Sequence, residues 1–422
     1  MRKSILRRLS AATVAAGMAI ASPALATNGY FANGYGGASK GMAGAGVAVP
    51  AGVLGLAQNP AMGLKVGNQA GMCLTGFAPD RSVTISPGGA LTTGTHKSKN
   101  DFFLIPCGGA NWKLGDRASL GVFMFGNGGM NTEYTTNFFA PLAPPGVASA
   151  PLGVNLEQAF VSVNLSYKLN DQVTVGAAPI FAIQRFSATG LEPFGGFSSA
   201  PANVTNRGDD WSQGYGYNLG ILIEASPELT FGMSYRSRIE MEKFSKYSGL
   251  FANGGEFDVP ATATLGVALT PKTMPQWTFT GEVQKIFYSD IPSIANGNIP
   301  PFPALGTPGG LGFGWKDMMV YRLAAVYRYN PKLTLRGGVS YATKFIDDSS
   351  AVVNTLTPAT PQWHLSVGAS YKINDRWGIT TSYTHALDAS VTGMNPGLSG
   401  GAQPVKIRMK QDEFAFGVTY RW

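Results

Sequence analysis

The sequence predicts an all-β protein, a transmembrane β-barrel of about fourteen antiparallel strands that closes around an N-terminal plug. Three observations predict this fold. From Gln69 onward, segments of about ten or more residues alternate apolar with polar or small side chains. Between these segments, short turns alternate with long loops. Finally, the chain has 55 glycines among 422 residues and 13% charged residues, too glycine-rich for a helical protein and too weakly charged for a disordered one.

Residues 1–26 have the pattern of a secretory signal. Arg2, Lys3, Arg7 and Arg8 precede an apolar stretch at 11–21, and Ala24, Leu25 and Ala26 form the predicted cleavage site. The apolar stretch is too short to anchor the chain in a membrane, and no later run of about 18 apolar residues follows. The sequence therefore predicts an exported protein whose mature chain begins at Thr27.

Residues 27–66 are interpreted as a plug inside the barrel formed by residues 67–422. The segment is rich in Gly and Ala, contains one charged residue up to position 64, Lys40, and ends near Asn59-Pro60-Ala61. It has too much glycine for a stable helix and lacks the alternation of a strand, so its shape must come from its surroundings. The alternative, an exposed flexible linker, stays open at this point.

Fourteen segments are predicted as strands, an even number as in bacterial outer-membrane barrels. They are residues 69–80, 101–113, 117–127, 156–169, 172–186, 213–225, 228–242, 257–270, 275–289, 317–329, 332–346, 362–373, 376–388 and 407–422.

The connections alternate strictly between tight turns and long loops. Turn residues occur at 114–116, 170–171, 226–227, 270–272, 330–331 and 374–375. Long segments rich in Gly, Pro, Ser and Asn occur near 81–100, 128–155, 187–212, 243–256, 290–316, 347–361 and 389–406. A soluble sandwich has no reason to follow this rule, whereas an outer-membrane barrel has short periplasmic turns and long external loops. The pattern predicts the outer membrane of a Gram-negative bacterium, with both termini on the periplasmic side.

The last strand shows which face meets lipid. Phe414, Phe416, Val418, Tyr420 and Trp422 alternate with smaller or more polar residues. A barrel of about fourteen strands is too wide to be filled by its own side chains, so the apolar face must point outward. The terminal aromatic residue resembles the C-terminal signal by which barrel-assembly machinery recognises its substrates.

The remaining composition argues against several other classes of protein. Lys and Arg give a net charge of +8 but form no basic run after the N-terminus, so nucleic acid is not an expected partner. No metal-binding pattern and no cofactor motif is present. The three histidines lie in no nucleophile motif and Gly-x-Ser-x-Gly is absent, so no enzyme is predicted. Cys73 and Cys107 fall in neighbouring predicted strands, and either a disulfide or two buried thiols fits the sequence.

Two sets of residues are candidates for contact with a ligand. The first comprises cations on the polar strand face, predicted to point into the lumen with Arg328 and with Glu224, Glu240 and Glu282: Arg236, Arg238, Arg322, Arg336 and Lys344. They would meet a carboxylate or, alternatively, pair with lumen acids, Glu240 balancing Arg236 or Arg238. The second comprises loop residues that would line an apolar groove or simply pack on each other, among them Phe138, Phe139, Leu191, Phe194, Phe197, Leu250, Phe251, Ile299 and Phe302.

The glycine-rich string Gly41-Met42-Ala43-Gly44-Ala45, followed by Asn59-Pro60-Ala61 just before the first strand, resembles the FadL-like family of outer-membrane long-chain fatty acid and hydrocarbon transporters. The likeness covers essentially the whole mature chain. It implies a monomeric fourteen-stranded barrel with an N-terminal hatch, in which Gly41, Gly44, Asn59, Pro60 and Ala61 belong to the gating element.

The resemblance also implies uptake through a groove between external loops, an internal apolar pocket and a kinked third strand that offers a lateral exit. The third predicted strand contains Gly121 and ends in glycines near 126–129, the residues a bend needs. One departure concerns residues 47–51, which are apolar where the family commonly has acidic side chains. A substrate without a carboxylate therefore stays open.

The predicted function is passive uptake of a hydrophobic small molecule across the outer membrane. The expected partners are that molecule, outer-membrane lipid and the barrel-assembly machinery, which would read the strand ending in Trp422. Two alternatives stay open: a general diffusion porin for small solutes, and a structural or adhesive barrel. Fatty acids, alkanes and aromatic hydrocarbons fit the sequence equally well.

Overall fold

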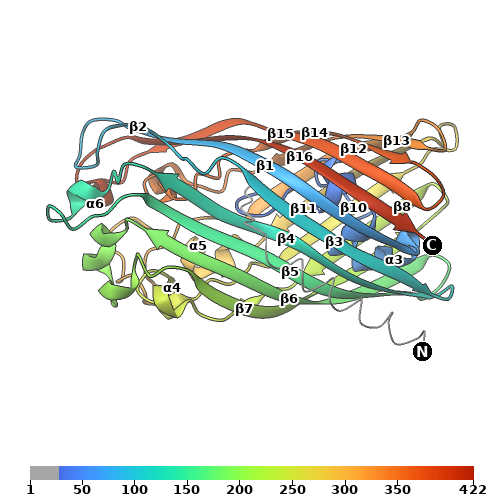
Figure 1. Cartoon of the computed structure of the whole chain (residues 1–422), viewed down its shortest axis with the longest axis horizontal. Helices are drawn as coiled ribbons and strands as arrows, with labels where there is room; N and C mark the ends of the chain where they lie inside the picture. Colours follow the sequence, from blue (N-terminus) through green and yellow to red (C-terminus); the bar gives the residue numbers. More distant parts are fainter. Residues whose placement is uncertain (1–27) are drawn as a thin grey trace, which may run out of the picture.

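A computed structural model describes residues 28–422, which form one closed antiparallel barrel (Figure 1). The predicted signal at 1–26 lies outside the described residues. Of the sixteen strands in this part of the chain, β2 and β9 each pair with a single neighbour, so fourteen make the ring. Pairing of β1 with β16 over the whole length of both strands closes it. No helix within residues 28–422 is long and apolar enough to cross a membrane.

The ring strands are β1 (Gln69–Ile85), β3 (Phe103–Leu114), β4 (Ala118–Tyr134), β5 (Leu152–Lys168), β6 (Val173–Thr189), β7 (Asp210–Glu224), β8 (Leu229–Arg236), β10 (Thr262–Leu269), β11 (Trp277–Ile286), β12 (Met318–Arg328), β13 (Leu333–Ala342), β14 (Trp363–Lys372), β15 (Trp377–Gly393) and β16 (Val405–Arg421). The two additional strands are β2 (Gly94–Lys97) and β9 (Glu240–Met241).

Short helices occupy the lumen and the external loops. The lumen contains α2 (Gly36–Lys40), η2 (Val53–Ala57), η3 (Pro60–Met62) and α3 (Gly63–Val66). The external loops contain η4 (Ala140–Leu142), η5 (Glu192–Phe197), η6 (Pro201–Asn203), η7 (Ser245–Tyr247), α4 (Ala252–Gly255), η8 (Tyr288–Asp290), α5 (Pro292–Ala295), η9 (Asp348–Ser350), η10 (Val353–Thr355) and α6 (Pro396–Ser399).

Each of the fourteen predicted segments overlaps one ring strand, so the predicted fold class is confirmed. Several boundaries were wrong. The wall ladder of β8 stops at Arg236 and that of β10 begins at Thr262, although strands were predicted over 228–242 and 257–270. Ile239 and Val259 instead form an isolated bridge, and both side chains are fully buried beneath the external loops. The alternation of apolar and polar residues continues beyond the ends of β8 and β10 because Ile239 and Val259 belong to the apolar core under the loops. It does not reflect contact with lipid.

The polarity of the wall reverses along β16. Near the C-terminus, the aromatic side chains of Phe414 and Phe416 are outward and about half exposed, while Glu413 points inward and is buried. Nearer the external loops, Ile407 and Met409 point inward and are fully buried. Apolar side chains thus face lipid at membrane level and the interior above it. The single outward apolar face predicted for 407–422 holds only for the C-terminal half of the strand.

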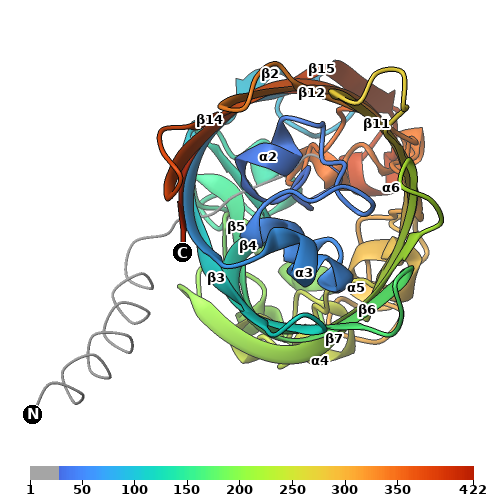
Figure 2. The same cartoon turned by 90° about the vertical axis from the view of Figure 1, so that its right-hand side faces the viewer.

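The segment from residue 28 to residue 66 lies inside the ring (Figure 2). Its residues from Tyr30 to Met62 are mostly buried, and its backbone touches the wall directly at several glycines. A Cβ atom at Gly176 would collide with Pro60, one at Gly220 with Asn59, and one at Gly232 with the Val47 carbonyl. The wall therefore has no side chains at the points where this segment is seated. We refer to residues 28–66 as the plug.

The ladder between β3 and β4 is incomplete. It runs only from Gly108–Met124 to Leu114–Ala118, and the outer half of β4 has no partner on β3. On its other side, β4 shifts register against β5 between Gly126 and Gly128. The plug supplies bonds in place of β3: Ala32 donates its backbone N–H to the Asn127 carbonyl at 2.8 Å, and Gly129 donates to the Tyr30 carbonyl at 3.0 Å. The glycines near 126–129 thus form an irregular, interrupted part of the wall, which we call the β3–β4 break.

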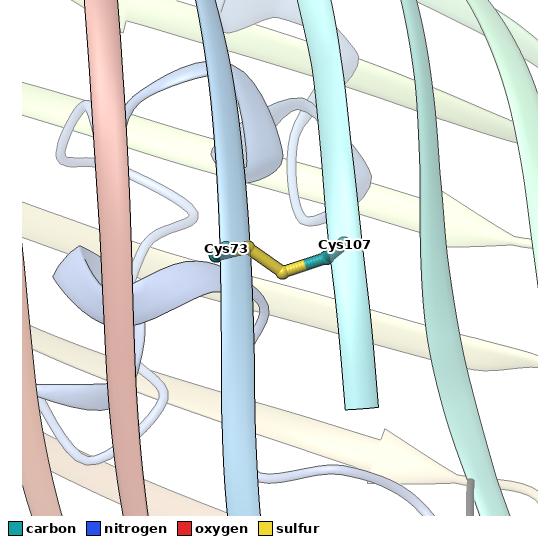
Figure 3. Close-up of a disulfide and its surroundings, with 2 residues drawn as sticks. All are labelled: Cys73 and Cys107. Atoms are coloured by element: carbon teal, nitrogen blue, oxygen red, sulfur yellow. A yellow bond between two sulfur atoms is a disulfide. The ribbon is translucent and has the colours of Figure 1, made fainter. Parts of the chain in front are cut away.

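Cys73 and Cys107 form a disulfide between β1 and β3 (Figure 3). The two residues are direct partners in the ladder, with a Cα–Cα distance of 5.0 Å, which is within the range a disulfide needs. Cys107 immediately precedes Gly108, where pairing with β4 is lost. The disulfide therefore fastens β3 to its one remaining neighbour at the edge of the break.

Replacing both Cys73 and Cys107 with serine is expected to leave a barrel that assembles, because nine backbone pairs still hold β1 to β3. The disulfide closes a 34-residue separation, so its loss should lower the free energy of unfolding by about 2–4 kcal/mol. Urea unfolding of the lipid-reconstituted protein measures the difference. An unchanged urea midpoint, with the oxidised state of the parent protein verified by alkylation, would contradict this expectation.

Candidate functional site

Glu282 on β11 fixes the middle of the plug. Its carboxylate accepts the backbone N–H groups of Gly46 and Val47 at 2.9 and 3.0 Å, and it pairs with Arg322 on β12 at 2.9 Å. Both charged side chains are almost fully buried. A buried carboxylate needs partners for its lone pairs, and here the plug backbone and Arg322 supply them. Arg322, predicted as a ligand contact, is therefore engaged in holding the plug.

Lys40 on α2 forms a second buried ion pair, with Glu413 on β16. The lysine and glutamate side chains are 5% and 1% exposed, so neither charge is hydrated and each depends on the other. Sequence reasoning missed this pair, although one signal was available. A single cation within an apolar segment that is itself buried must find a carboxylate on the surrounding wall.

The Asn59-Pro60-Ala61 motif, near the end of the plug, is bonded to strand β5 of the wall. The Asn59 side chain accepts the Ala61 backbone N–H at 2.9 Å and donates to the Val47 carbonyl at 2.7 Å. The Pro60 carbonyl accepts hydrogen bonds from Ser166 at 2.6 Å and Asn164 at 3.1 Å. Asn59 thus caps the short helix η3, and the Pro60 carbonyl fastens that helix to β5.

The two glycines singled out in the plug also lie at close contacts. Gly41 packs against Gly368 on β14, and a Cβ atom there would come within 2.9 Å of that Cα. Gly44 has φ +88°, a conformation that side chains disfavour, and lies beside the Arg322 guanidinium. A larger side chain at either position would clash with these neighbours and displace the plug from the wall.

Arg236, at the outer end of β8, is a buried cation that lacks a carboxylate partner among residues 28–422. One of its terminal nitrogens donates to the Asn127 side-chain oxygen at 2.8 Å and to the Tyr35 hydroxyl at 3.3 Å. Its guanidinium also lies over the rings of Phe31 and Phe160, 4.8 and 5.5 Å from their centroids. Arg236 thus links β8 across the lumen to the plug and to the β3–β4 break.

A small polar cavity of about 30 Å³ adjoins this cation. Its lining includes Arg236, Arg322, Asn218, Thr262 and Glu282, and the Nε atoms of both arginines are buried without a hydrogen-bond acceptor in the described structure. Such a space accommodates one or two water molecules, which would satisfy those donors. The lumen beside the plug is therefore polar, whereas the space above it is not.

The remaining predicted lumen cations do not line this cavity. Arg238 is half-exposed in the external region and pairs with Asp258 and Glu256, not with Glu240, which is exposed. Burial raises the pKa of the Asp258 carboxyl, and the Met241 N–H and Arg238 oppose that rise. Arg336 on β13 alternates with the outward Leu335 and donates to Ser370 of β14 at 2.7 Å.

Two further expectations about lumen-facing charges were wrong. Lys344 lies beyond the end of β13, is half-exposed, and pairs with Asp348 in the external loop. Arg328 is exposed at the opposite end of the wall and donates to the Pro275 carbonyl at 3.4 Å. Glu224 lies at that same end and pairs with Lys65 of the plug. The predicted strand 332–346 overran β13, which placed Lys344 on the wall by mistake.

An apolar cavity of about 50 Å³ lies among the external loops above the plug. Its lining contains no charged side chain: Met130, Val154, Phe186, Leu191, Leu250, Phe251, Ser293, Leu305, Leu311, Gly312, Phe313, Val353 and Leu356. Among the predicted loop aromatics, Phe251 lines this cavity. Phe194 instead packs on Phe139, with ring centroids 5.0 Å apart, and Phe197 is half-exposed. Most loop aromatics therefore pack on one another, and a small apolar space remains between them.

Buried apolar side chains connect this cavity to the plug in one contiguous cluster. Leu191 and Phe251 belong to it at the loop end, and Tyr30 and Leu56 at the plug end. Between them, Tyr30, Tyr288 and Trp315 form a group with ring centroids 5.1–6.0 Å apart. The packed interior is thus apolar from the loop cavity down to Phe31, which lies beside Arg236 and the β3–β4 break. Within residues 28–422, no group of three or more His, Cys, Asp or Glu side chains is arranged to hold a metal ion.

Comparison with known proteins gives consistent results. The sequence profile of the family described as "Outer membrane protein transport protein (OMPP1/FadL/TodX)" matches residues 13–422. The long-chain fatty acid transport protein of Escherichia coli O6:H1 (strain CFT073) is 23% identical over 354 residues, which cover 73% of this chain and 74% of that protein.

Two solved structures share the fold. The crystal structure of the P. putida toluene transporter TodX has a TM-score of 0.71 at 19% identity and covers 92% of this chain and 99% of its own. A Pseudomonas aeruginosa FadL homologue has a TM-score of 0.67 at 14% identity, covering 93% and 99%.

Replacing Glu413 with glutamine should loosen the plug without preventing barrel assembly. The change keeps the size of the side chain but leaves the Lys40 ammonium buried without its carboxylate, which costs about 3–5 kcal/mol. Proteoliposomes containing this variant should swell faster in small sugars than those with the parent protein. Asp171→Asn is the matched control, because its pair with Lys168 is exposed at the rim. Equal swelling of both variants would contradict a plug held by this ion pair.

Proposed function

Since this chain belongs to the outer membrane transport family OMPP1/FadL/TodX, we propose that it takes up hydrophobic small molecules passively across the outer membrane. The observation that carries the proposal is the contiguous apolar cluster, which runs inside the wall from an uncharged loop cavity to the plug. A substrate that enters it leaves water at each contact, at about 25 cal/mol per Å² of apolar area buried. No energy-coupling motif is present, so consumption of the substrate inside the cell sets the direction.

The structure corresponds to a closed state. The loop cavity of about 50 Å³ is well below the roughly 300–1,000 Å³ of typical ligand pockets, so the loops must separate to admit a substrate. Below the cavity, the substrate meets the plug segment 30–32 where it is bonded to β4 at the β3–β4 break. We propose that displacement of this segment opens a lateral exit toward the bilayer.

Arg236 is proposed to sense the head group of an acidic substrate. Its present partners, the Asn127 amide and the Tyr35 hydroxyl, are neutral. A carboxylate that reached it would add an opposite charge and a second acceptor oxygen, so its hydrogen bonds to Arg236 would be stronger and would displace the present ones. Such a substrate would free Tyr35 of the plug and Asn127 of the β3–β4 break from Arg236 at the same time. A neutral hydrocarbon would have to pass without this exchange.

The oligomeric state, the lipid contacts and the recognition of this barrel by the assembly machinery are also proposals. The barrel is expected to act as a monomer surrounded by outer-membrane lipid. The barrel-assembly machinery would recognise β16 through Trp422, whose half-exposed ring lies 6.2 Å from that of Trp112 near the end of β3. A diffusion porin and an adhesive barrel gain no support from the relatives, and a plugged lumen opposes free diffusion of solutes.

Filling the loop cavity tests the proposed path. Val353→Phe should reduce uptake of both long-chain fatty acids and toluene at least about fivefold, because overpacking this lining costs about 1–3 kcal/mol. Uptake of labelled substrate by cells that lack other carriers provides the measurement. Val147→Phe, at a half-exposed loop position outside the cavity, is the control. If the two variants transport equally well, the substrate does not pass through this cavity.

Replacing Arg236 with methionine should separate acidic from neutral substrates. Fatty acid uptake is expected to fall about tenfold, because a charge-assisted contact of roughly 1.5–3 kcal/mol is lost, while toluene uptake should persist. Arg238→Met serves as the control, since Arg238 already has two carboxylate partners. Equal loss of both substrates, in a variant whose barrel assembles normally, would show that Arg236 only holds the plug in place.

A further inference from the structure

The outer face of the barrel carries a group of cations directly above the lipid-facing band. On β16, three consecutive outward positions beyond Asp412 are Lys410, Arg408 and Lys406. On the neighbouring hairpin, Lys97 of β2 contributes a fourth cation. Val405, Ile407 and Met409, which alternate with the β16 cations, point inward and are buried, so these three charges lie on the outer face of the β16 segment that runs toward the external loops (Figure 1). We call Lys97, Lys406, Arg408 and Lys410 the basic patch.

Hydroxyl groups flank the patch on both sides. In the ladder, Arg408 lies between Ser82 of β1 and Ser390 of β15. Lys406 lies between Thr84 of β1 and Thr392 of β15 in the same way. All four hydroxyl residues occupy outward positions, alternating with buried residues such as Val83 and Val391. Each rung therefore presents a cation between two hydroxyls, which suits a group with several acceptor oxygens.

The patch has more cations than nearby carboxylates to neutralise them. Among the described residues, its ion-pair partners are Asp80 and Asp388. Asp80 is shared by Lys97 at 3.2 Å and by Arg408 and Lys410 at 3.8 Å each, while Asp388 pairs with Arg408 at 2.6 Å. Lys406 forms no ion pair within residues 28–422. Asp412 is occupied by Tyr383 and His385.

Other lysines near the external rim differ in this respect. Lys285, Lys316 and Lys344 each have an aspartate of their own: Asp317, Asp347 and Asp348. They are one-to-one surface pairs of the kind that contributes little to binding or stability. They therefore provide a natural control for the patch, with a similar location and the same residue type.

The height of the patch matches the lipid head groups. Lys410 is four residues beyond Phe414, or about 13 Å along the strand, and strand tilt reduces this to about 10 Å above the aromatic edge. The polar region of a leaflet extends about 5–8 Å beyond the hydrocarbon, and lysine and arginine stems span the remainder. Outward Leu74 and Phe416 offer an apolar surface for acyl chains immediately below.

We propose that the basic patch binds the phosphate groups of an anionic glycolipid of the outer leaflet. The excess cations pair with phosphate oxygens, the flanking serines and threonines bond to phosphate and sugar, and the acyl chains lie along the β1–β16 face. Phosphate oxygens would take over the weak 3.8 Å contacts to Asp80. A soluble acidic protein is a poorer fit, because the apolar band directly below the patch is covered by membrane.

The test compares the triple variant K406Q/R408Q/K410Q with the control K285Q/K316Q/K344Q. Both are purified in mild detergent, and mass spectrometry together with phosphorus analysis counts the glycolipid retained per barrel. Because three cations that attract an anionic surface are removed, the patch variant should retain at least about tenfold less glycolipid per barrel than the parent. The control should match the parent. Equal retention in both variants overturns the proposal.

A second measurement uses the unmodified protein. After delipidation, it is mixed with phosphatidylcholine vesicles that contain or lack purified lipopolysaccharide, at low and high salt. Binding that requires the glycolipid and weakens with salt supports the proposal, and binding indifferent to both overturns it. If the triple variant does not assemble, R408Q alone is compared in the same way. Uptake of hydrophobic substrate should be unchanged in every patch variant, which keeps this test independent of the transport function.

Discussion

Every backbone polar group in contact with lipid must find a partner within the protein, and the rest of this structure depends on that requirement. Pairing of β1 with β16 over seventeen residues satisfies it by closing the sheet. A ring of fourteen strands is too wide to be filled by its own side chains, so the plug fills it and is held by Glu282 and Glu413. At the β3–β4 break the wall itself fails the requirement, and plug residues 30–32 supply the missing bonds. The same segment therefore completes the wall and obstructs the lumen.

Sequence reasoning succeeded where the signal is local. Period-two alternation and turn chemistry at sites such as Asn170-Asp171 and Asn374-Asp375 identified every ring strand, because each depends on neighbouring residues alone. It also suggested the plug, since the glycine-rich segment 27–66 showed neither a helical nor a strand pattern of its own. The state of Cys73 and Cys107 stayed open because it depends on the register of two strands, which sequence does not define to a single residue.

The failures share a physical cause. Above the membrane, the alternation of β16 continues in reverse, with Ile407 and Met409 inward and Lys406 and Arg408 outward, because external loops replace lipid as the boundary of the apolar core. A pattern that records only alternation cannot detect this reversal. Cation partners are equally nonlocal: Lys40 and Glu413 are 373 residues apart, and Arg236 reaches its partners across the lumen. Candidate residues could be named from sequence, but whether each was free or already paired could not.

Comparison of the bonds at the two possible exits favours the lateral route. Expelling the plug toward the periplasm breaks the buried Lys40–Glu413 pair, removes two backbone donors from Glu282, and exposes the buried apolar side chains of the whole plug to water. Displacing residues 30–32 from β4 breaks a few backbone hydrogen bonds worth about 1 kcal/mol each, together with the neutral contacts of Arg236. A substrate that buries about 100–200 Å² of apolar surface gains about 2.5–5 kcal/mol, which matches the smaller of these costs. The plug can then remain seated while its leading residues move, so the bore stays closed to water and solutes as a hydrophobic molecule leaves through the wall.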